Sequence, residues 1–250
     1  MISAGIDIGS RTVKLVVVEN GEIILVRKDM NSYNPLEVCR KIIDGVQYDT
    51  ITATGYGRNL FRNYYDCRVI SEIKAFAIGA RKVCPDCRTI LDIGGQDTKA
   101  ISLTETGHIE RFEMNDKCAA GTGKFLEIMA TALGFGMEEF ITAGSSTRNA
   151  VKINSMCTVF AESEVISMLA QGHDRSEISR GIHETICRRS AAMLKRVYVG
   201  GRIAFFGGVA MNSCVNDILS QEIGSDLFVP GDPQIVGALG CAYMKTTKES

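Results

Sequence analysis

The sequence predicts an α/β protein made of two similar lobes with a cleft between them. Strand patterns alternate with helix patterns along the chain, which is typical of α/β folds. The segment GIDIGSRTVKLVVVENGEIILVRK, starting at Gly5, resembles ILDIGGQDTKAISLTETGHIERFEMN, starting at Ile90. Both contain Asp-Ile-Gly, with a lysine seven residues after the aspartate. A chain of 250 residues is long enough to give each copy its own core.

Each repeated segment predicts a meander of three strands. Asn20-Gly21 in the first copy indicates a type I′ hairpin, because both central residues of that turn need positive φ. Thr106-Gly107 is the weaker counterpart in the second copy. A further short strand is expected at residues 203–206, before Gly207-Gly208.

Apolar residues at helical spacing predict helices between and after the two meanders. Asp174 and Glu177 have capping-box spacing before one of them, although that motif usually begins with Ser or Thr. The expected ranges are 35–46, 71–83, 119–133, 158–170, 176–199 and 235–245.

Composition excludes several classes of function. The formal net charge is −1, so no broad basic face is expected to attract nucleic acid or anionic lipid. No apolar run approaches the roughly 18 residues of a membrane span, and MISAGIDIGS lacks the basic start of a secretory signal. Nine scattered cysteines favour metal or redox chemistry over a disulfide framework in a cytosolic chain. We therefore expect a cytoplasmic protein with no nucleic-acid or membrane partner.

Two glycine turns indicate a phosphate site. The sequences DIGS at 7–10 and DIGG at 92–95 each end a strand, where glycine lets the backbone approach a phosphate. The aspartates could hold a hydrated Mg²⁺. A single DxG is usually only a turn, but two copies in register and the pair Gly207-Gly208 favour nucleotide binding. Gly121 to Lys124 is not a Walker loop, because Cys118 and Phe125 occupy positions where that motif needs Gly and Ser or Thr.

The cysteines divide into three groups. Cys118 and Cys157 each precede a predicted helix, whose N-terminus would stabilise a thiolate or an anionic cluster. Two cysteines cannot complete a four-cysteine cluster, but a symmetric dimer could. The residues alone favour two separate, buried thiols.

The sequence CPDC at 84–87 could be half a metal site or a dithiol, and a reduced pair is the favoured interpretation. The remaining cysteines are expected to be structural; those in predicted helices should pack as small apolar groups. These are Cys39, Cys187 and Cys241 in helices, together with Cys67 and Cys214. The three histidines form no ligand pattern.

Longer motifs connect the chain to a known family. They are GIDIGS, ATGYGRN from Ala53, LDIGGQDTK, NDKCAAGTGKFLE, CTVFAESEVIS, GGVAMN and GALG. The sequence resembles the ATP-dependent activators of 2-hydroxyacyl-CoA dehydratases, whose relatives include ATPase subunits of benzoyl-CoA reductase and reductases of double-cubane cluster proteins. The resemblance implies the sugar kinase, Hsp70 and actin fold, with two RNase H-like lobes around a nucleotide cleft. Lobe I would comprise residues 1–88 and the C-terminal helix 233–250, and lobe II residues 89–232.

The resemblance also implies site residues. A homodimer would hold one [4Fe–4S] cluster at its two-fold axis through Cys118 and Cys157. Asp7 and Asp92 fall where the fold holds Mg²⁺, and Glu72 lies near where related ATPases position a water. The implied ATP or ADP contacts are Ser10, Arg11, Thr12, Val13, Lys14, Gly94, Gly95, Gln96, Asp97, Gly207, Gly208, Val209, Ala210 and Gln234.

The implied activity is ATP-driven electron transfer. Ferredoxin or flavodoxin would reduce the cluster, and the acceptor would be an iron–sulfur dehydratase, a benzoyl-CoA-type reductase or a double-cubane protein. A cluster-free ATPase or small-molecule kinase of the same fold is the alternative, although no motif supplies a clear catalytic base. A non-catalytic nucleotide-sensing module is the third possibility.

Overall fold

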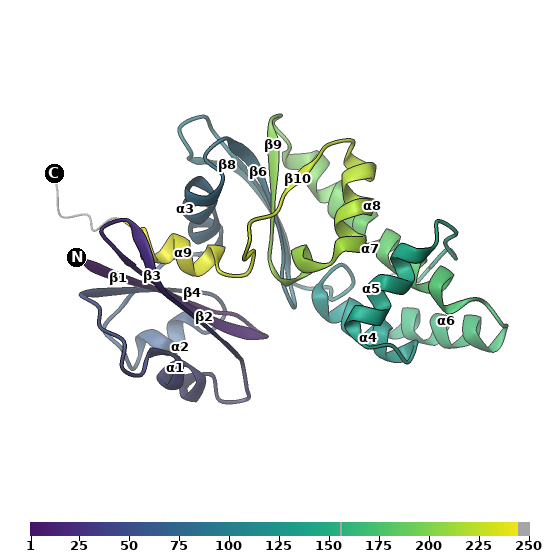
Figure 1. Cartoon of the computed structure of the whole chain (residues 1–250), viewed down its shortest axis with the longest axis horizontal. Coiled ribbons are helices and arrows are strands. Elements are labelled where there is room, and N and C mark those ends of the chain that lie inside the picture. The colour runs from purple at the N-terminus through teal and green to yellow at the C-terminus, as the bar shows by residue number, and fades with distance from the viewer. Residues whose placement is uncertain (156, 245–250) are drawn as a thin grey trace.

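Two five-stranded sheets of the same topology form the centre of the protein (Figure 1). The computed structural model describes residues 1–155 and 157–244. The first sheet has the order β3-β2-β1-β4-β5, and the second has the order β10-β9-β6-β7-β8. The strands are β1 (Ile2–Ile8), β2 (Thr12–Glu19), β3 (Glu22–Met30), β4 (Thr50–Thr54), β5 (Arg68–Val69), β6 (Cys87–Ile93), β7 (Thr98–Leu103), β8 (Ile109–Asn115), β9 (Arg202–Phe206) and β10 (Leu227–Phe228).

The repeat extends from topology to register. β1 is antiparallel to β2 and parallel to β4, and β6 is likewise antiparallel to β7 and parallel to β9. Asp7 therefore lies opposite Lys14, and Asp92 lies opposite Lys99. Asn20 and Gly21 have φ values of 52° and 89°, as the hairpin requires. Both predicted meanders and the strand at 203–206 are confirmed.

The predicted helices are all present within the described residues, with shifted ends in several cases. Residues 158–170 are predicted correctly, whereas the first and last predicted helices are shorter, and the predicted end at 245 lies outside the described residues. The helices are α1 (Pro35–Ile43), α2 (Arg58–Arg62), α3 (Glu72–Val83), α4 (Gly123–Ala132), α5 (Met137–Ser146), α6 (Thr158–Ala170), α7 (Arg175–Val197), the 3₁₀ turn η1 (Gly208–Met211), α8 (Ser213–Ile223) and α9 (Val236–Ala242).

Two helices separate the sheets. The C-terminal α9 packs on β1 and β2, where Ala238 and Leu239 contact Val16 and Val18 (Figure 1). Its partner α3 lies against the second sheet, and Phe76 joins the core there. The expected division into lobes between residues 88 and 89 remains a prediction. Helix α3 belongs to the first lobe in that division, but it packs against the second sheet.

Glycines let α3 and α9 cross at close range. A Cβ atom on Gly240 would collide with the carbonyl oxygen of Ala75, and one on Gly79 would collide with that of Val236. The two backbones therefore meet without an intervening side chain.

Outer helices cover the remaining face of each sheet. α1 and α2 bury Cys39 and Phe61 against the first sheet. Helices α4 to α8 form a larger core with the second sheet, which includes Phe125, Phe140 and Phe205. Cys39, Cys187, Cys214 and Cys241 are buried and Cys67 is half-buried, in agreement with structural roles. Among the described residues, no helix is both long and apolar enough to span a membrane.

We predict that Gly240→Ala lowers the free energy of unfolding by about 1–3 kcal/mol, because the added methyl group forces α9 away from α3. Urea unfolding followed by circular dichroism measures the change. Gly231→Ala is the matched control, since nothing lies near its Cβ position, and its effect should stay within about 0.5 kcal/mol. Equal unfolding midpoints for the two variants would contradict the close crossing.

Candidate functional site: a cleft between the two sheets

A cavity of about 570 Å³ lies between the sheets. Its walls come from the turns after β1, β6 and β9 and from helices α3, α4 and α5. Most of the predicted site residues line it, namely Asp7, Ser10, Arg11, Thr12, Lys14, Glu72, Asp92, Gly94, Gly95, Asp97, Gly207, Gly208, Val209 and Gln234. Val13 and Ala210 instead belong to the buried cores, and Gln96 is exposed.

The two repeated aspartates lie in this cavity, each paired with a lysine. Asp7 Oδ2 is 3.1 Å from Lys14 Nζ, and Asp92 Oδ2 is 3.1 Å from Lys99 Nζ. Each pair joins neighbouring antiparallel strands at the same register. The spacing of seven residues in the sequence therefore corresponds to a duplicated ion pair.

The second pair is part of a larger charge cluster. Lys99 Nζ also lies 2.6 Å from Asp97 Oδ2 and 2.8 Å from Glu72 Oε2. Three carboxylates thus surround one ammonium group that is almost completely buried. Lys99 was absent from the predicted site, although its spacing from Asp92 was visible in the sequence.

Burial and charge act on the ionisation of this cluster. Burial raises the pKa of Asp92 to about 6, and it raises the pKa of Glu72 as well. Burial alone would lower the pKa of Lys99, but the carboxylates of Asp92, Glu72 and Asp97 outweigh it and raise that pKa. Lys99 therefore stays protonated, and the excess of carboxylates can attract a divalent cation.

Glycines with positive φ bring the backbone against both aspartates. Gly55 has φ 88° and Gly207 has φ 87°, and they follow the corresponding strands β4 and β9. A Cβ atom at Gly55 would lie 2.6 Å from the Asp7 carboxylate, and one at Gly207 would lie 2.7 Å from the Asp92 carboxylate. Gly55 was quoted within ATGYGRN but was not among the predicted site residues.

The start of α4 is tied to the second glycine turn. The amide of Gly123 donates to Gly94 O at 2.8 Å, and the amide of Lys124 donates to Gly95 O at 2.9 Å. These two N–H groups already have protein acceptors, which agrees with the rejection of a Walker loop. Across the cleft, Arg11 Nη2 contacts Glu127 Oε1 on α4 at 2.9 Å.

Apolar side chains from α4, α5 and η1 also line the cavity, and such a surface suits a planar base. Its walls include Leu126, Met137, Ile141, Val209 and Met211. The sequence did not indicate Met137 and Ile141, because α5 was not predicted. This helix begins after Gly136 without a Ser, Thr, Asp or Asn cap.

A buried histidine holds one of the lining residues. Asn212 Nδ2 lies 3.1 Å from His183 Nε2, and His183 Nδ1 lies 2.8 Å from Ser179 O. Burial lowers the pKa of His183 to about 4, so its ring is neutral at pH 7. Its ring then donates from Nδ1 to the carbonyl and accepts at Nε2 from the amide. Asn212 Oδ1 in turn accepts from the amide of Val215 at the start of α8.

Cys118 and Cys157 are free and exposed on the second lobe. Cys157 is the N-cap of α6, as predicted, and no side chain caps that helix. The expectation that Cys118 directly precedes a helix is wrong, since α4 begins only at Gly123. Gly121 has φ 113°, which no right-handed helix accommodates.

These two cysteines could supply two of the ligands of a four-thiolate site. Both thiols are accessible, and the unpaired N–H groups at the start of α6 favour a negative charge beside Cys157. Within the described residues, neither belongs to a group of three or more metal-ligating side chains. Further ligands would therefore have to come from another chain.

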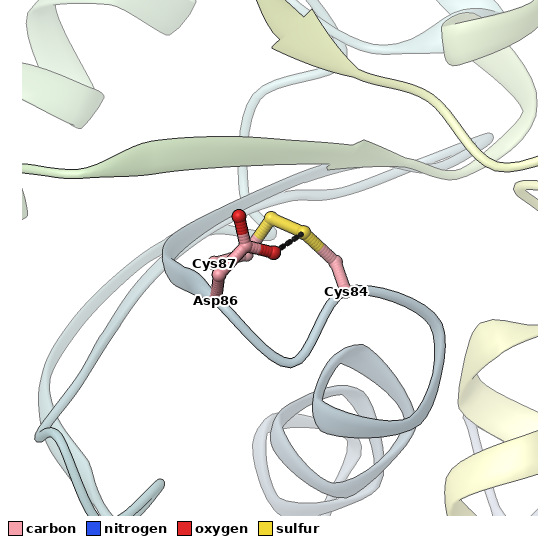
Figure 2. Close-up of side chains that lie close together, drawn as sticks. All are labelled: Cys84, Asp86 and Cys87. Carbon is pink, nitrogen blue, oxygen red and sulfur yellow. Dashed lines mark hydrogen bonds between the residues drawn. A yellow bond between two sulfur atoms is a disulfide. The ribbon is translucent and has the colours of Figure 1, made fainter.

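The CPDC segment departs from its prediction. Cys84 and Cys87 form a disulfide, not the expected reduced pair (Figure 2). The turn between α3 and β6 brings the two sulfurs together, and Cys87 N donates to Cys84 O at 3.1 Å. Asp86 lies beside Cys84 Sγ at 3.4 Å. Neither cysteine lines the cavity described above.

The two repeated sheets, each with an aspartate at the end of a central strand, have the sugar kinase, Hsp70 and actin fold. The same fold occurs in a ROK family glucokinase from Streptomyces griseus, with a TM-score of 0.62 and 12% identity. The chain belongs to the BadF/BadG/BcrA/BcrD ATPase family, whose model matches residues 4–244.

Individual relatives are similar over their whole length. The chain is 40% identical to the 2-hydroxyisocaproyl-CoA dehydratase activator of Clostridioides difficile, covering 97% of this chain and 94% of that protein. It is 37% identical to the (R)-2-hydroxyglutaryl-CoA dehydratase activating ATPase of Acidaminococcus fermentans, covering 98% of both. A solved structure of the Clostridium difficile activator with bound ADPNP has a TM-score of 0.88 and 38% identity, covering 97% of this chain and 93% of that one.

We predict that Lys99→Met costs roughly 3–5 kcal/mol of folding stability at pH 8, because it removes the cation shared by three carboxylates and leaves Glu72 only its longer contact with Arg58. Lys14→Met is the matched control from the other lobe and should cost less, since the Lys14 side chain is 13% exposed against 2% for Lys99. Urea unfolding at pH 8 and pH 5 measures both.

The stability deficit of Lys99→Met should depend on pH in a definite direction. Burial already raises the pKa values of Asp92 and Glu72 while Lys99 lowers them, so removing Lys99 should raise both further and make protonation favour the folded variant. The deficit of Lys99→Met should therefore shrink as the pH falls from 8 to 5. A deficit that is independent of pH would show that lost packing, and not unpaired charge, dominates.

Proposed function

We propose that this protein is an ATP-hydrolysing, low-potential electron donor that activates a partner iron–sulfur enzyme such as a 2-hydroxyacyl-CoA dehydratase. One observation carries the proposal: the loop of Cys118 is hydrogen-bonded to the turn that lines the nucleotide cavity. The names of the two relatives, an activator and an activating ATPase, support the same assignment.

The cleft supplies the residues for nucleotide and metal. Asp7 and Asp92 would hold Mg²⁺ with its phosphates, and Glu72 would position the attacking water. The glycine turns at 94–95 and 207–208 would admit the phosphates, and the apolar wall would take the adenine. These roles match a cavity lined by an excess of carboxylates over Lys99 and by several apolar side chains.

Cys118 and Cys157 would hold one [4Fe–4S] cluster together with the same residues of a second copy. A symmetric pair of chains satisfies the four-ligand requirement that one chain leaves open. When bound, such a cluster supplies one-electron transfer at low potential. The N-terminus of α6 would stabilise its negative charge through unpaired N–H groups.

The hydrogen bonds around Gly121 connect the two sites. Thr98 Oγ1, on the strand after the glycine turn, donates to Gly121 O at 2.8 Å. Gly123 N donates to Gly94 O and Lys124 N donates to Gly95 O, so three hydrogen bonds join the glycine turn and the strand after it to the segment that follows Cys118. A nucleotide that moves the turn at 94–95 would thus move the Cys118 loop. A shift of 200 mV in potential would need roughly 5 kcal/mol of such coupling, at 59 mV per 1.4 kcal/mol.

Other partners and classes fit less well. The chain is 29% identical to a benzoyl-CoA reductase component of Thauera aromatica, which supports a reductase as another acceptor, and a double-cubane cluster protein is a third. Ferredoxin or flavodoxin in the cytoplasm would be the electron source. A cluster-free kinase or nucleotide sensor leaves the exposed free cysteines Cys118 and Cys157 without a role.

We predict about four irons per dimer in protein purified without oxygen, and loss of that iron in Cys118→Ala and Cys157→Ala. Each substitution removes two of four ligands from a symmetric pair of chains. Iron assay and visible absorbance measure the cluster, and nucleotide binding confirms that the variants are folded. Cys67→Ala is the control and should keep its iron, because Cys67 packs beside the first-sheet core. Full iron in either test variant would refute the ligand assignment.

We predict that Asp92→Asn lowers ATP hydrolysis by at least about 100-fold while the cluster spectrum stays unchanged, because a neutral amide cannot hold Mg²⁺ as a carboxylate does. ATP-dependent electron delivery to the dehydratase should fall with hydrolysis. Asp49→Asn, outside the cavity, is the control. Hydrolysis at the unsubstituted rate would show that Asp92 is not needed for the metal.

A further inference from the structure

A second concave surface lies on the cysteine-bearing lobe. It has a volume of about 650 Å³ and is formed by the segment before Cys157 and by one side of α7. We name it the basic groove, and its lining residues are Lys152, Ile153, Asn154, Ser155, Thr185, Arg188, Arg189 and Ala192.

The basic groove adjoins both exposed cysteines. Ser155 lies two residues before Cys157 in the sequence. On the other side, Arg189 Nη1 donates to Ala120 O at 2.8 Å, within the loop that follows Cys118. A molecule seated in the groove would therefore contact the chain segments that carry both thiols.

The charge of this groove is locally positive, although the whole chain has a net charge of −1. From Thr185 to Val197, α7 contains four basic residues and no acidic residue. Arg188 and Lys152 are exposed, and Lys152 forms no ion pair with any residue in the described part of the chain.

Nearby carboxylates are already engaged. Glu164 accepts from the backbone amides of Asn154 and Ser155 at 2.9 and 2.8 Å, which fixes the rim of the groove. Glu184 pairs with Arg180 at 3.1 Å and with Arg188 at 3.4 Å. These contacts only partly compensate the basic groove, because the Arg188 side chain remains 50% exposed.

We propose that the basic groove docks the acidic surface of the protein that reduces the cluster. This inference rests on the proposed function, which places the cluster at Cys118 and Cys157. In the docked complex one electron passes from the reduced donor to the oxidised cluster, and no covalent bond forms or breaks. A patch of this sign accelerates encounter with an acidic partner and orients it beside the cysteines.

Charge argues against a second copy of this chain as the occupant. In a symmetric dimer, a groove that lies on the two-fold axis would face its own copy. Two basic grooves facing each other would repel, whereas an acidic partner is attracted.

The test compares two double variants of the purified, cluster-containing protein. Lys152→Glu/Arg188→Glu reverses the charge of two residues in the basic groove. Arg40→Glu/Arg62→Glu makes the same change in charge on α1 and α2 of the other lobe. The probe is a reduced, acidic two-cluster ferredoxin, mixed with each protein in a stopped-flow instrument. At low salt, we expect the groove variant to be reduced at least roughly tenfold more slowly, and the control variant to match the unsubstituted protein.

Salt and a small reductant separate the possible outcomes. The rate for the unsubstituted protein should fall as salt rises, and the groove variant should lose most of this dependence. Dithionite should reduce all three proteins equally, which shows that the clusters are intact. Lys152→Gln/Arg188→Gln should be reduced by ferredoxin at a rate between those of the unsubstituted protein and Lys152→Glu/Arg188→Glu. It is used in place of Lys152→Glu/Arg188→Glu if the charge-reversed variant does not fold.

Two results would overturn the inference alone: equal rates with ferredoxin for both double variants, or a defect confined to electron delivery to the dehydratase. Absence of iron from the unsubstituted protein would instead refute the proposed function. A dimer that dissociates only in the groove variant would show that the basic groove is a subunit interface.

Discussion

The buried ammonium group of Lys99 is the interaction on which the cleft depends. It forms ion pairs with carboxylates from β6, from the turn before β7 and from α3. One ammonium group therefore links three elements of the fold. Removing these groups from water is costly, and only close pairing compensates that cost. The other lobe has a smaller version, Lys14 with Asp7, which is more exposed and has no third partner among the residues described. The duplicated fold is therefore electrostatically asymmetric.

Local spacing made much of this fold predictable. The two Asp-Ile-Gly turns and the lysines seven residues later determine the cross-strand pairs, because antiparallel register follows from strand and turn length. The contribution of Glu72 to Lys99 was not visible, since it depends on the packing of α3 against β6 and β7, which spacing along the chain does not decide. Lys99 was not among the predicted site residues, and its ion pair with Glu72 could not be predicted from spacing along the sequence.

Other misses have backbone causes. Residues 119–133 have helical apolar spacing, but Gly121 has positive φ and delays the helix to Gly123. The apolar wall of the cavity was missed because α5 starts after a glycine, without the side-chain cap that marks a helix start. The disulfide between Cys84 and Cys87 depends on the tight turn that connects α3 to β6. The spacing of the two cysteines in the sequence does not predict this turn. In each of these cases the backbone conformation at a turn or helix start, and not the type of side chain, explains the missed prediction.

The close crossing of α3 and α9 has a mechanical consequence. Gly79 and Gly240 leave the two helix backbones in contact, so no long side chains interlock at that point. Rotating one helix over the other there changes few rotamers, whereas sliding either helix along its sheet would disrupt the packing of Phe76 or Leu239. A change in the angle between the two sheets would therefore disturb the fewest side chains if it turned about this crossing.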